Sequence, residues 1–220
     1  MDNDRTIILK KPLGELIAVQ LKQEIYNRKF GFGERLIEAD LAERFDVSRS
    51  TIREALKILE QEELIISKAR KGTFIREFTD KDLEEMTEVR LMIETTAFVK
   101  AVNNLKDNHF NDLEEIINKM EKEAENEDWN QLFDLDLKFH QYVINQCGNT
   151  RMIKIYESIG VQIRVYLAHL DKHYTSPKSF YKEHRELLDV IKKKDEELIM
   201  NQISQHIDYV EEKLLRKRDK

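Results

Sequence analysis

The sequence has very little cysteine, proline and glycine. Cys147 is the only cysteine, which excludes an internal disulfide and is typical of a protein from a reducing compartment. Its simplest interpretation is a small residue buried on a helix, and the alternative is a reactive thiol. Two prolines and six glycines are few for 220 residues, and four of the glycines fall within the first 72. Because both residue types interrupt helices, their scarcity in the remainder predicts long helices there.

Long apolar runs are also missing. No stretch approaches the roughly 18 residues that a membrane span needs, and MDNDRTIILKK at the N-terminus has an apolar block too short for a secretory signal. We therefore expect a globular protein of the cytoplasm with no membrane partner. The sequence also lacks the G-x-S-x-G, HExxH and phosphate-loop patterns of common enzymes.

An excess of basic charge is absent as well, because the net charge is −6. This balance argues against a protein that coats nucleic acid over its whole surface. The charge is unevenly distributed: residues 1–78 hold 15 Lys and Arg against 14 Asp and Glu, whereas residues 79–220 hold 22 against 29. Between Ser48 and Arg76 the counts are 7 against 4. A local basic face on an acidic chain is compatible with selective DNA binding, because phosphate contacts act locally.

Residues 1–78 have the pattern of a small DNA-binding domain. Helical spacing of apolar residues predicts helices near 13–26, 38–44 and 48–62, and LIIS and TFIREF flank the turn residues KARKG as two short strands. Three helices followed by a hairpin predict a winged helix-turn-helix. We expect a second domain over residues 79–220.

The third helix has the composition of a DNA-reading helix. Its start, DVSRSTIRE, places small hydroxyls and arginines where a recognition helix presents its first turn to base edges. The residues expected to face DNA are Ser48, Arg49, Ser50, Thr51 and Arg53. The residues expected to face the core, at i, i+3, i+4 and i+7, are Ile52, Ala55, Leu56 and Leu59. Taken alone, the stretch could equally start an exposed amphipathic helix with Ser48 as its cap.

Residues 79–220 are predicted to be almost entirely helical. Polar breaks such as ENED, CGN and TSP separate segments with apolar residues three and four apart. The expected helices cover 80–105, 109–125, 128–147, 149–172, 178–194 and 195–217. An antiparallel bundle of about six helices is the natural packing, so the fold class is mainly α.

Four polar residues interrupt the apolar stripes of this bundle. Asp136 and His140 are four apart and share one helix face, whereas His184 and His206 lie on the two last helices. Three imidazoles and a carboxylate could converge on a divalent metal and leave open positions for water or an effector. The spacing leaves ordinary hydrogen-bonded or surface histidines as the alternative. A rival pair, His169 and His173, sits at a helix end and is expected to be exposed.

The first domain also resembles a known family. It resembles the N-terminal domain of GntR-family bacterial transcription regulators over about 65 residues, in the stretch GERLIEADLAERFDVSRSTIREALKILEQEELI followed by KGTFI. The resemblance implies that Arg49 and Arg53 contact operator DNA, that the neighbouring hydroxyls touch phosphates or bases, and that Lys71 and Gly72 form the tip of the wing. Members often carry an arginine in the helix before the turn, where this chain has Ala39.

The second domain resembles the ligand-sensing FCD domain of the FadR-type branch. The resemblance lies in the stretches DLDLKFHQYVINQCGN, YKEHRELLDVIKKKDEEL and QHIDYVEE. The six predicted helices, rather than seven, resemble the shorter, VanR-like subgroup. It implies one divalent metal per chain, zinc, nickel or manganese, bound by Asp136, His140, His184 and His206. This metal would help to hold a small carboxylate.

Two arginines are candidates to grip that carboxylate. Arg90 and Arg164 lie on bundle helices, and a guanidinium can bind a carboxylate through two hydrogen bonds. The alternative for each is a surface arginine paired with a nearby Glu.

The sequence therefore predicts a transcription regulator, most simply a repressor, whose operator binding a small organic acid modulates at a metal site. One winged helix-turn-helix domain reads only a half-site, so we expect a homodimer on a palindromic operator. The alternatives are a regulator that senses the metal itself and, from another class, a metal-dependent hydrolase.

Overall fold

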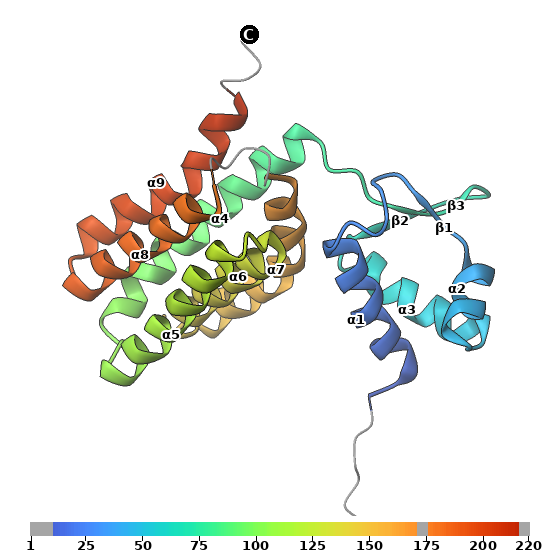
Figure 1. Cartoon of the computed structure of the whole chain (residues 1–220), viewed down its shortest axis with the longest axis horizontal. Coiled ribbons are helices and arrows are strands. Elements are labelled where there is room, and N and C mark those ends of the chain that lie inside the picture. Colours follow the sequence, from blue (N-terminus) through green and yellow to red (C-terminus); the bar gives the residue numbers. More distant parts are fainter. Residues whose placement is uncertain (1–10, 171–175, 216–220) are drawn as a thin grey trace, which may run out of the picture. The chain divides into compact units, whose positions relative to one another are not determined.

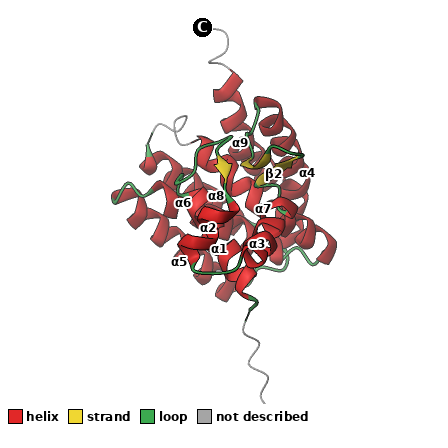
Figure 2. Cartoon of the chain, turned by 90° about the vertical axis from the view of Figure 1, so that its right-hand side faces the viewer, coloured by secondary structure: helices red, strands yellow, loops and turns green. Residues whose placement is uncertain are grey.

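The computed structural model describes residues 11–170 and 176–215. It divides the chain into two compact units with a boundary between Glu77 and Phe78. Figure 2 shows that helices predominate and that the strands form one small sheet. Within the described ranges, no helix has the length and apolar character needed to cross a membrane.

The N-terminal unit is a winged helix-turn-helix, as predicted (Figure 1). Its helices are α1 (Leu13–Tyr26), α2 (Glu38–Phe45) and α3 (Arg49–Gln61). Its strands are β1 (Arg35–Leu36), β2 (Ile65–Lys68) and β3 (Gly72–Ile75), in the antiparallel order β1-β3-β2. β2 and β3 form the predicted hairpin, with Lys68 opposite Gly72.

Strand β1, which adds a third strand to the hairpin, was not predicted from the sequence. In this strand Arg35 lies opposite Phe74 and Leu36 opposite Thr73. Leu36 is buried. A strand of two residues is too short to show the alternation of apolar and polar side chains by which strands are recognised in a sequence.

The turn between α2 and α3 sets the direction of the recognition helix. Asp46 ends α2 in a left-handed conformation, with φ of 51°. Ser48 then begins α3, and its hydroxyl accepts a hydrogen bond from the backbone N–H of Thr51 at 3.2 Å. This bond confirms the predicted cap, which satisfies one of the backbone donors left unpaired at a helix start.

Loss of this cap should destabilise the N-terminal unit. We expect Ser48→Ala to lower its free energy of unfolding by about 0.5–2 kcal/mol, because the freed N–H of Thr51 has no other acceptor within its own helix. Urea denaturation followed by circular dichroism measures the change, and Ser67→Ala, at an exposed position of β2, is the control. Equal stability of the two variants would show that the cap contributes nothing.

The apolar face of α3 is buried as predicted. Ile52, Ala55 and Leu59 have no measurable exposure, and Leu56 is 5% exposed. This face packs against α1 and α2. The opposite face of α3, which carries Arg49 and Arg53, stays open to solvent. Burial of one face thus fixes which side chains the helix can present to a ligand.

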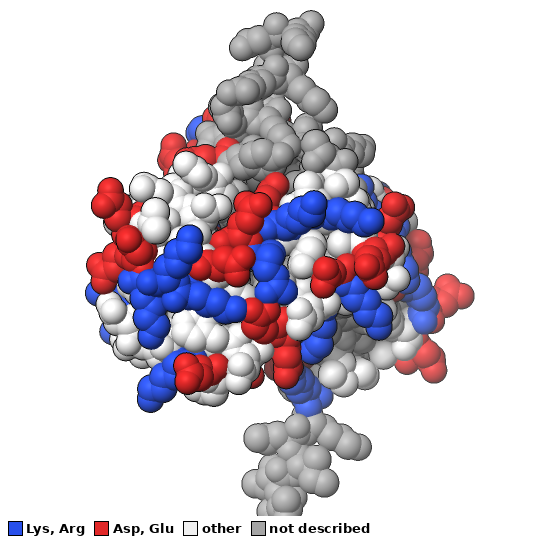
Figure 3. Space-filling view, turned by 60° about the vertical axis from the view of Figure 1, so that its left-hand side comes forward, with Lys and Arg blue, Asp and Glu red and all other residues white. Residues whose placement is uncertain are grey.

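The C-terminal unit is a bundle of helices, as predicted (Figure 1). The helices are α4 (Asp80–Val102), α5 (Asp107–Glu125), α6 (Trp129–Asn145), α7 (Thr150–Leu170), α8 (Pro177–Lys193) and α9 (Glu196–Leu215). Helix α6 is central, because it contacts α4, α5, α7 and α8, while α9 packs along α4 and α8. The core includes Phe98, Phe139 and Leu188. Charged side chains of both signs lie interspersed on the face shown in Figure 3.

Two details near helix ends differ from, or lie beyond, the sequence predictions. Cys147 is buried as expected, but it follows α6 in the turn that ends at Gly148, whose φ is 71°. The predicted pair of exposed histidines, His169 and His173, lies outside the residues whose side chains the structure describes.

Candidate DNA-reading helix and metal centre

The first turn of α3 presents a cluster of hydroxyl groups. The Ser48 hydroxyl lies 2.7 Å from that of Ser50 and 2.8 Å from that of Thr51. Ser48 and Ser50 are exposed and Thr51 is half-buried. Since Ser48 also caps the helix, the groups that would touch DNA are held in place by the same contacts that begin the helix.

Arg49 and Arg53 follow this cluster on the exposed face. The Nε of Arg53 donates to Glu38 Oε2 at 2.8 Å, and the arginine side chain remains 66% exposed. A solvent-exposed ion pair contributes about 0–1 kcal/mol, so releasing Arg53 to another anion costs little. Arg49 is exposed at the first position of α3.

The tip of the wing lies between β2 and β3. Lys71 is in the turn and Gly72 begins β3 with φ of +111°. A Cβ atom at Gly72 would lie 2.8 Å from Nε of Arg35, so both the backbone conformation and the space favour glycine here. The exposed Arg70 and Lys71 bring two positive charges to this turn.

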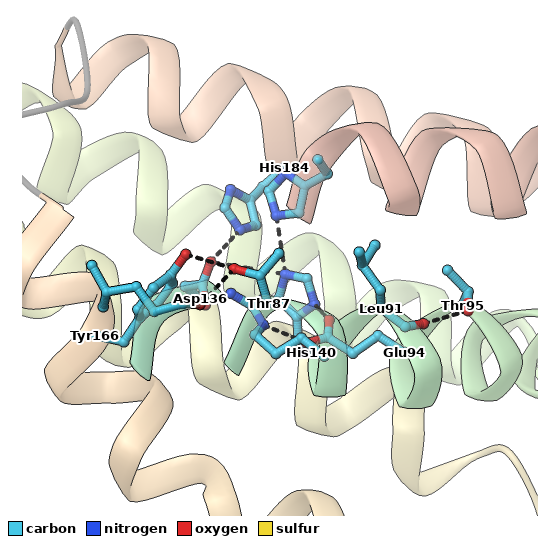
Figure 4. A network of polar contacts seen from close by, with 11 residues as sticks. Thr87, Leu91, Glu94, Thr95, Asp136, His140, Tyr166 and His184 are labelled. Carbon is cyan, nitrogen blue, oxygen red and sulfur yellow. Dashed lines mark hydrogen bonds and ion pairs between the residues drawn. The ribbon is translucent and has the colours of Figure 1, made fainter. Parts of the chain in front are cut away.

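The four polar residues of the bundle converge at one point. One potential ligand atom from each of Asp136, His140, His184 and His206 lies within 4.8 Å of the other three. They come from α6, α8 and α9. Asp136, His140 and His184 are buried and His206 is half-buried. Figure 4 shows His184 above Asp136, with His140 beside Glu94.

The hydrogen bonds of His184 determine which ring nitrogen faces the cluster with a lone pair. Its Nδ1–H donates to the carbonyl of Phe180 at 2.8 Å, one turn earlier on α8. In the neutral ring, Nε2 therefore carries a lone pair. That atom lies 2.8 Å from Oδ1 of Asp136. A lone pair and a carboxylate oxygen repel each other at this distance unless a positive charge lies between them.

The ring of His140 is oriented by Glu94, which has no measurable exposure. Burial opposes ionisation of this carboxyl, but the charges and hydrogen bonds of Arg90 and His140 outweigh it and lower the pKa of Glu94 to about 2. The carboxylate accepts from Nδ1–H of His140 at 2.5 Å, so in the neutral ring Nε2 of His140 also bears a lone pair. This Nε2 lies 3.2 Å from Nε2 of His206.

The electrostatics of the remaining two members fit a metal site. Burial, followed by the neighbouring His184 and His140, lowers the pKa of His206 well below its usual range, which favours the neutral imidazole that metals bind. For Asp136, burial opposes ionisation, but His140 and His184 outweigh it and lower the pKa to about 2. Among the described residues, Oδ2 of Asp136 and Nδ1 of His206 have no hydrogen-bond partner.

These residues fit a divalent cation. A proton can bridge two of the atoms, for example Asp136 and His184, but it cannot satisfy a carboxylate and three nitrogens together. Three imidazoles and a carboxylate are a ligand set suited to zinc, nickel or manganese. A carboxylate behind a ligating histidine, as Glu94 lies behind His140, is also the usual outer-shell arrangement of such sites.

Arg90 is joined to the cluster by Glu94, a residue that the sequence reasoning missed. Arg90 is 3% exposed, and its Nε donates to Glu94 Oε1 at 2.6 Å. Its Nη2 is buried without a hydrogen-bond partner in the described part of the chain. The spacing of Arg90 and Glu94 in RLMIE, four residues apart on one helix face, was the available signal.

Arg164 has a different environment. It is 1% exposed, its Nε lies 2.5 Å from Asp134 Oδ1, and its Nη2 donates to the carbonyl of Asn130 at 3.0 Å. Arg90 thus pairs with a glutamate, as the alternative held, whereas Arg164 pairs with an aspartate, and neither arginine lies on the surface. Arg90 is linked to the cluster through Glu94, which also contacts His140.

A small cavity opens beside the cluster. It has a volume of about 150 Å³ and is lined by Glu183 of α8 with Gln202, Gln205 and His206 of α9. Because His206 belongs to both the cavity and the cluster, the cavity adjoins the cluster between α8 and α9.

Both units of the chain match known protein families. Residues 13–75 match the family described as bacterial regulatory proteins, gntR family, and residues 85–209 match the FCD domain. The HTH-type transcriptional regulator YdhC of Bacillus subtilis is 30% identical, over 86% of this chain and 85% of its own length. The gluconate operon transcriptional repressor of Bacillus licheniformis is 29% identical, over 91% of this chain and 84% of its own.

Solved structures share the fold. A transcriptional regulator from Rhodococcus sp. RHA1 superposes with a TM-score of 0.77 at 22% identity, covering 91% of this chain and 97% of its own. Escherichia coli McbR/YncC gives 0.75, also at 22% identity, covering 93% and 100%. The chain therefore belongs to the GntR family of bacterial transcription regulators, and its C-terminal unit carries an FCD domain.

Proposed function

We propose that this GntR-family regulator is a repressor whose operator binding responds to a small carboxylate held at a divalent metal in the FCD domain. The observation that carries the proposal is the convergence of Asp136, His140, His184 and His206, with lone pairs of His140 and His184 directed inward by bonds on the far sides of their rings. Because the proposed ligand of the N-terminal unit is operator DNA, we place the protein in the cytoplasm.

In this proposal the N-terminal unit reads DNA through α3 and the wing. Arg49 and Arg53 would contact base edges, because arginine can donate two hydrogen bonds to a guanine. The hydroxyls of Ser48, Ser50 and Thr51 would contact phosphates or bases. Lys71, with Gly72 allowing the turn, would bring the wing tip to the phosphate backbone. A homodimer would place two such N-terminal units on a palindromic operator.

The bundle would bind the effector. A metal in this site supplies positive charge and open coordination positions to a carboxylate. Arg90, whose buried Nη2 is a donor without a partner among the described residues, would bind a second oxygen of the same ligand. We assign Arg164 the same role, in which the carboxylate of the ligand would compete with Asp134 for the guanidinium.

Two observations favour a hydroxylated acid as the effector. The cavity beside His206 is lined by amide and carboxylate side chains that can hydrogen-bond hydroxyl groups. Two relatives are named gluconate operon repressors. Gluconate, a polyhydroxy monocarboxylate, is therefore a rational first probe, together with other small sugar acids.

The test uses the zinc-loaded full chain and an operator selected from random duplexes. We expect nanomolar to micromolar binding by fluorescence anisotropy, and a shift in affinity when a sugar acid is added at fixed zinc, because a ligand that prefers one state must shift the equilibrium. A panel of small carboxylates at fixed zinc would identify the acid.

The control separates acid sensing from metal sensing. If removal of metal with a chelator releases the operator and no acid changes binding, the metal itself is the signal. If neither metal nor acid changes operator affinity, the proposed regulation through the cluster is wrong, although DNA binding by α3 would stand.

A further inference from the structure

Glu94 lies between two functional candidates. Its Oε1 accepts from Nε of Arg90 at 2.6 Å and its Oε2 accepts from Nδ1 of His140 at 2.5 Å. All three side chains are at most 3% exposed. Both carboxylate oxygens are thus committed, one to the candidate effector arginine of α4 and one to a candidate metal ligand of α6. Figure 4 shows Glu94 beside His140.

Glu94 makes more contacts than are needed to neutralise its buried carboxylate. Burying a carboxylate is costly, and pairing with Arg90 would compensate for the cost without any contact to α6. The contact with His140 adds a bond from one helix to another at the ring nitrogen opposite the cluster. Nitrogen Nε2 of His140 can offer a lone pair only while Nδ1 holds the proton.

We propose that Glu94 is the positioning residue of the metal centre: it holds the proton on Nδ1 of His140, so that Nε2 is presented to the metal, and it holds Arg90 beside the same site. The inference rests on the proposed metal site and adds to it the residue that orients a ligand. Because Glu94 contacts both Arg90 and a metal ligand, a displacement of Arg90 or of the metal would alter the contacts of Glu94.

The chemistry of glutamine shows why the carboxylate is needed. A glutamine at position 94 has one acceptor oxygen and one donor nitrogen. If its oxygen accepts from His140, its NH2 group faces the donor Nε of Arg90. If it turns around, its NH2 donates to Nδ1 of His140 and moves the ring proton to Nε2, which then points toward the metal position. The first orientation loses the bond to Arg90, and the second keeps a bond to His140 only by reversing it, which places the ring proton on the side of the metal position.

The experiment compares zinc affinity in wild type, Glu94→Gln and Glu88→Gln, using competition with a chromogenic chelator. We expect Glu94→Gln to bind zinc about 10–100-fold more weakly, as is typical when the partner behind a ligating histidine is removed. Glu88 is exposed on the same helix, so Glu88→Gln should match wild type. In metal-free wild type, ¹⁵N NMR of the histidines should show His140 with its proton on Nδ1.

A second variant keeps the test decisive if Glu94→Gln folds poorly. Glu94→Asp keeps a buried carboxylate opposite Arg90 but shortens the side chain by one methylene, so it should no longer reach both Nε of Arg90 and Nδ1 of His140, and it should bind zinc more weakly than wild type. If either Glu94 variant binds zinc like wild type, the positioning role is overturned. Failure of wild type itself to bind zinc would instead reject the metal site, so the two proposals fail separately.

Discussion

His184→Ala is expected to remove stoichiometric metal from the protein. The variant deletes Nε2, one of four converging ligand atoms, and leaves Oδ1 of Asp136 without its 2.8 Å partner. Loss of a direct ligand should weaken metal binding by more than the about 10–100-fold typical of an outer-shell change. Elemental mass spectrometry on untagged protein purified without chelator should find about one metal per chain in wild type, as the four-ligand site requires, and almost none in the variant.

Two further variants make this result specific. His206→Ala removes a ligand from α9 instead of α8 and should have the same effect. His109→Ala is the matched control, because His109 lies on α5, where its Nδ1 accepts from the backbone N–H of Lys106. Metal retained in both cluster variants, or lost equally in His109→Ala, would contradict the site. Wild type that remains metal-free after soaking with zinc, nickel and manganese would reject it outright.

The structure shows which parts of the candidate site a sequence can reveal. Asp136 and His140 were recognisable because a helix places residues four apart on one face, and their apolar neighbours indicated burial. The convergence with His184 and His206 was not visible in the spacing, since it depends on how α8 and α9 pack against the rest of the bundle. Resemblance to a family, rather than periodicity, supplied that step.

Glu94 shows more clearly what could not be recognised in the sequence. In the sequence it is one acid among 43, and charged residues are usually exposed. Its importance comes from being buried between Arg90 and His140, a relation that links residues 46 positions apart. By contrast, the first turn of α3 was predictable in detail, because its cap and its apolar face are local properties of thirteen consecutive residues.

This difference has a consequence for specificity. The DNA-reading face depends on local structure, so single substitutions there should alter binding without disturbing the FCD domain. The proposed metal centre draws on side chains from α4, α6, α8 and α9, so a ligand bound there would change the free energy of several helix contacts at once. A ligand at such a centre is well suited to shift an equilibrium between arrangements of the bundle.

Arg49→Ala is expected to have the largest effect on operator binding. Arg49 is exposed at the first position of α3, where a recognition helix approaches base edges. Loss of a bidentate contact to a base costs about 1–3 kcal/mol and relaxes specificity at that base pair. Anisotropy titrations against the selected operator, and against duplexes with single base-pair changes, measure both effects.

The control for this result is Lys57→Ala, which removes the same charge from an exposed position two turns further along α3. If Arg49 reads a base, its variant loses discrimination between operator and altered duplexes, whereas Lys57→Ala keeps it. If Arg49 contacts only phosphate, affinity falls similarly for all duplexes, and the slope of log affinity against log salt concentration decreases by about 1. Identical behaviour of the two variants would show that the start of α3 does not read DNA, and recognition would then have to come from the wing or from a face of the N-terminal unit other than α3.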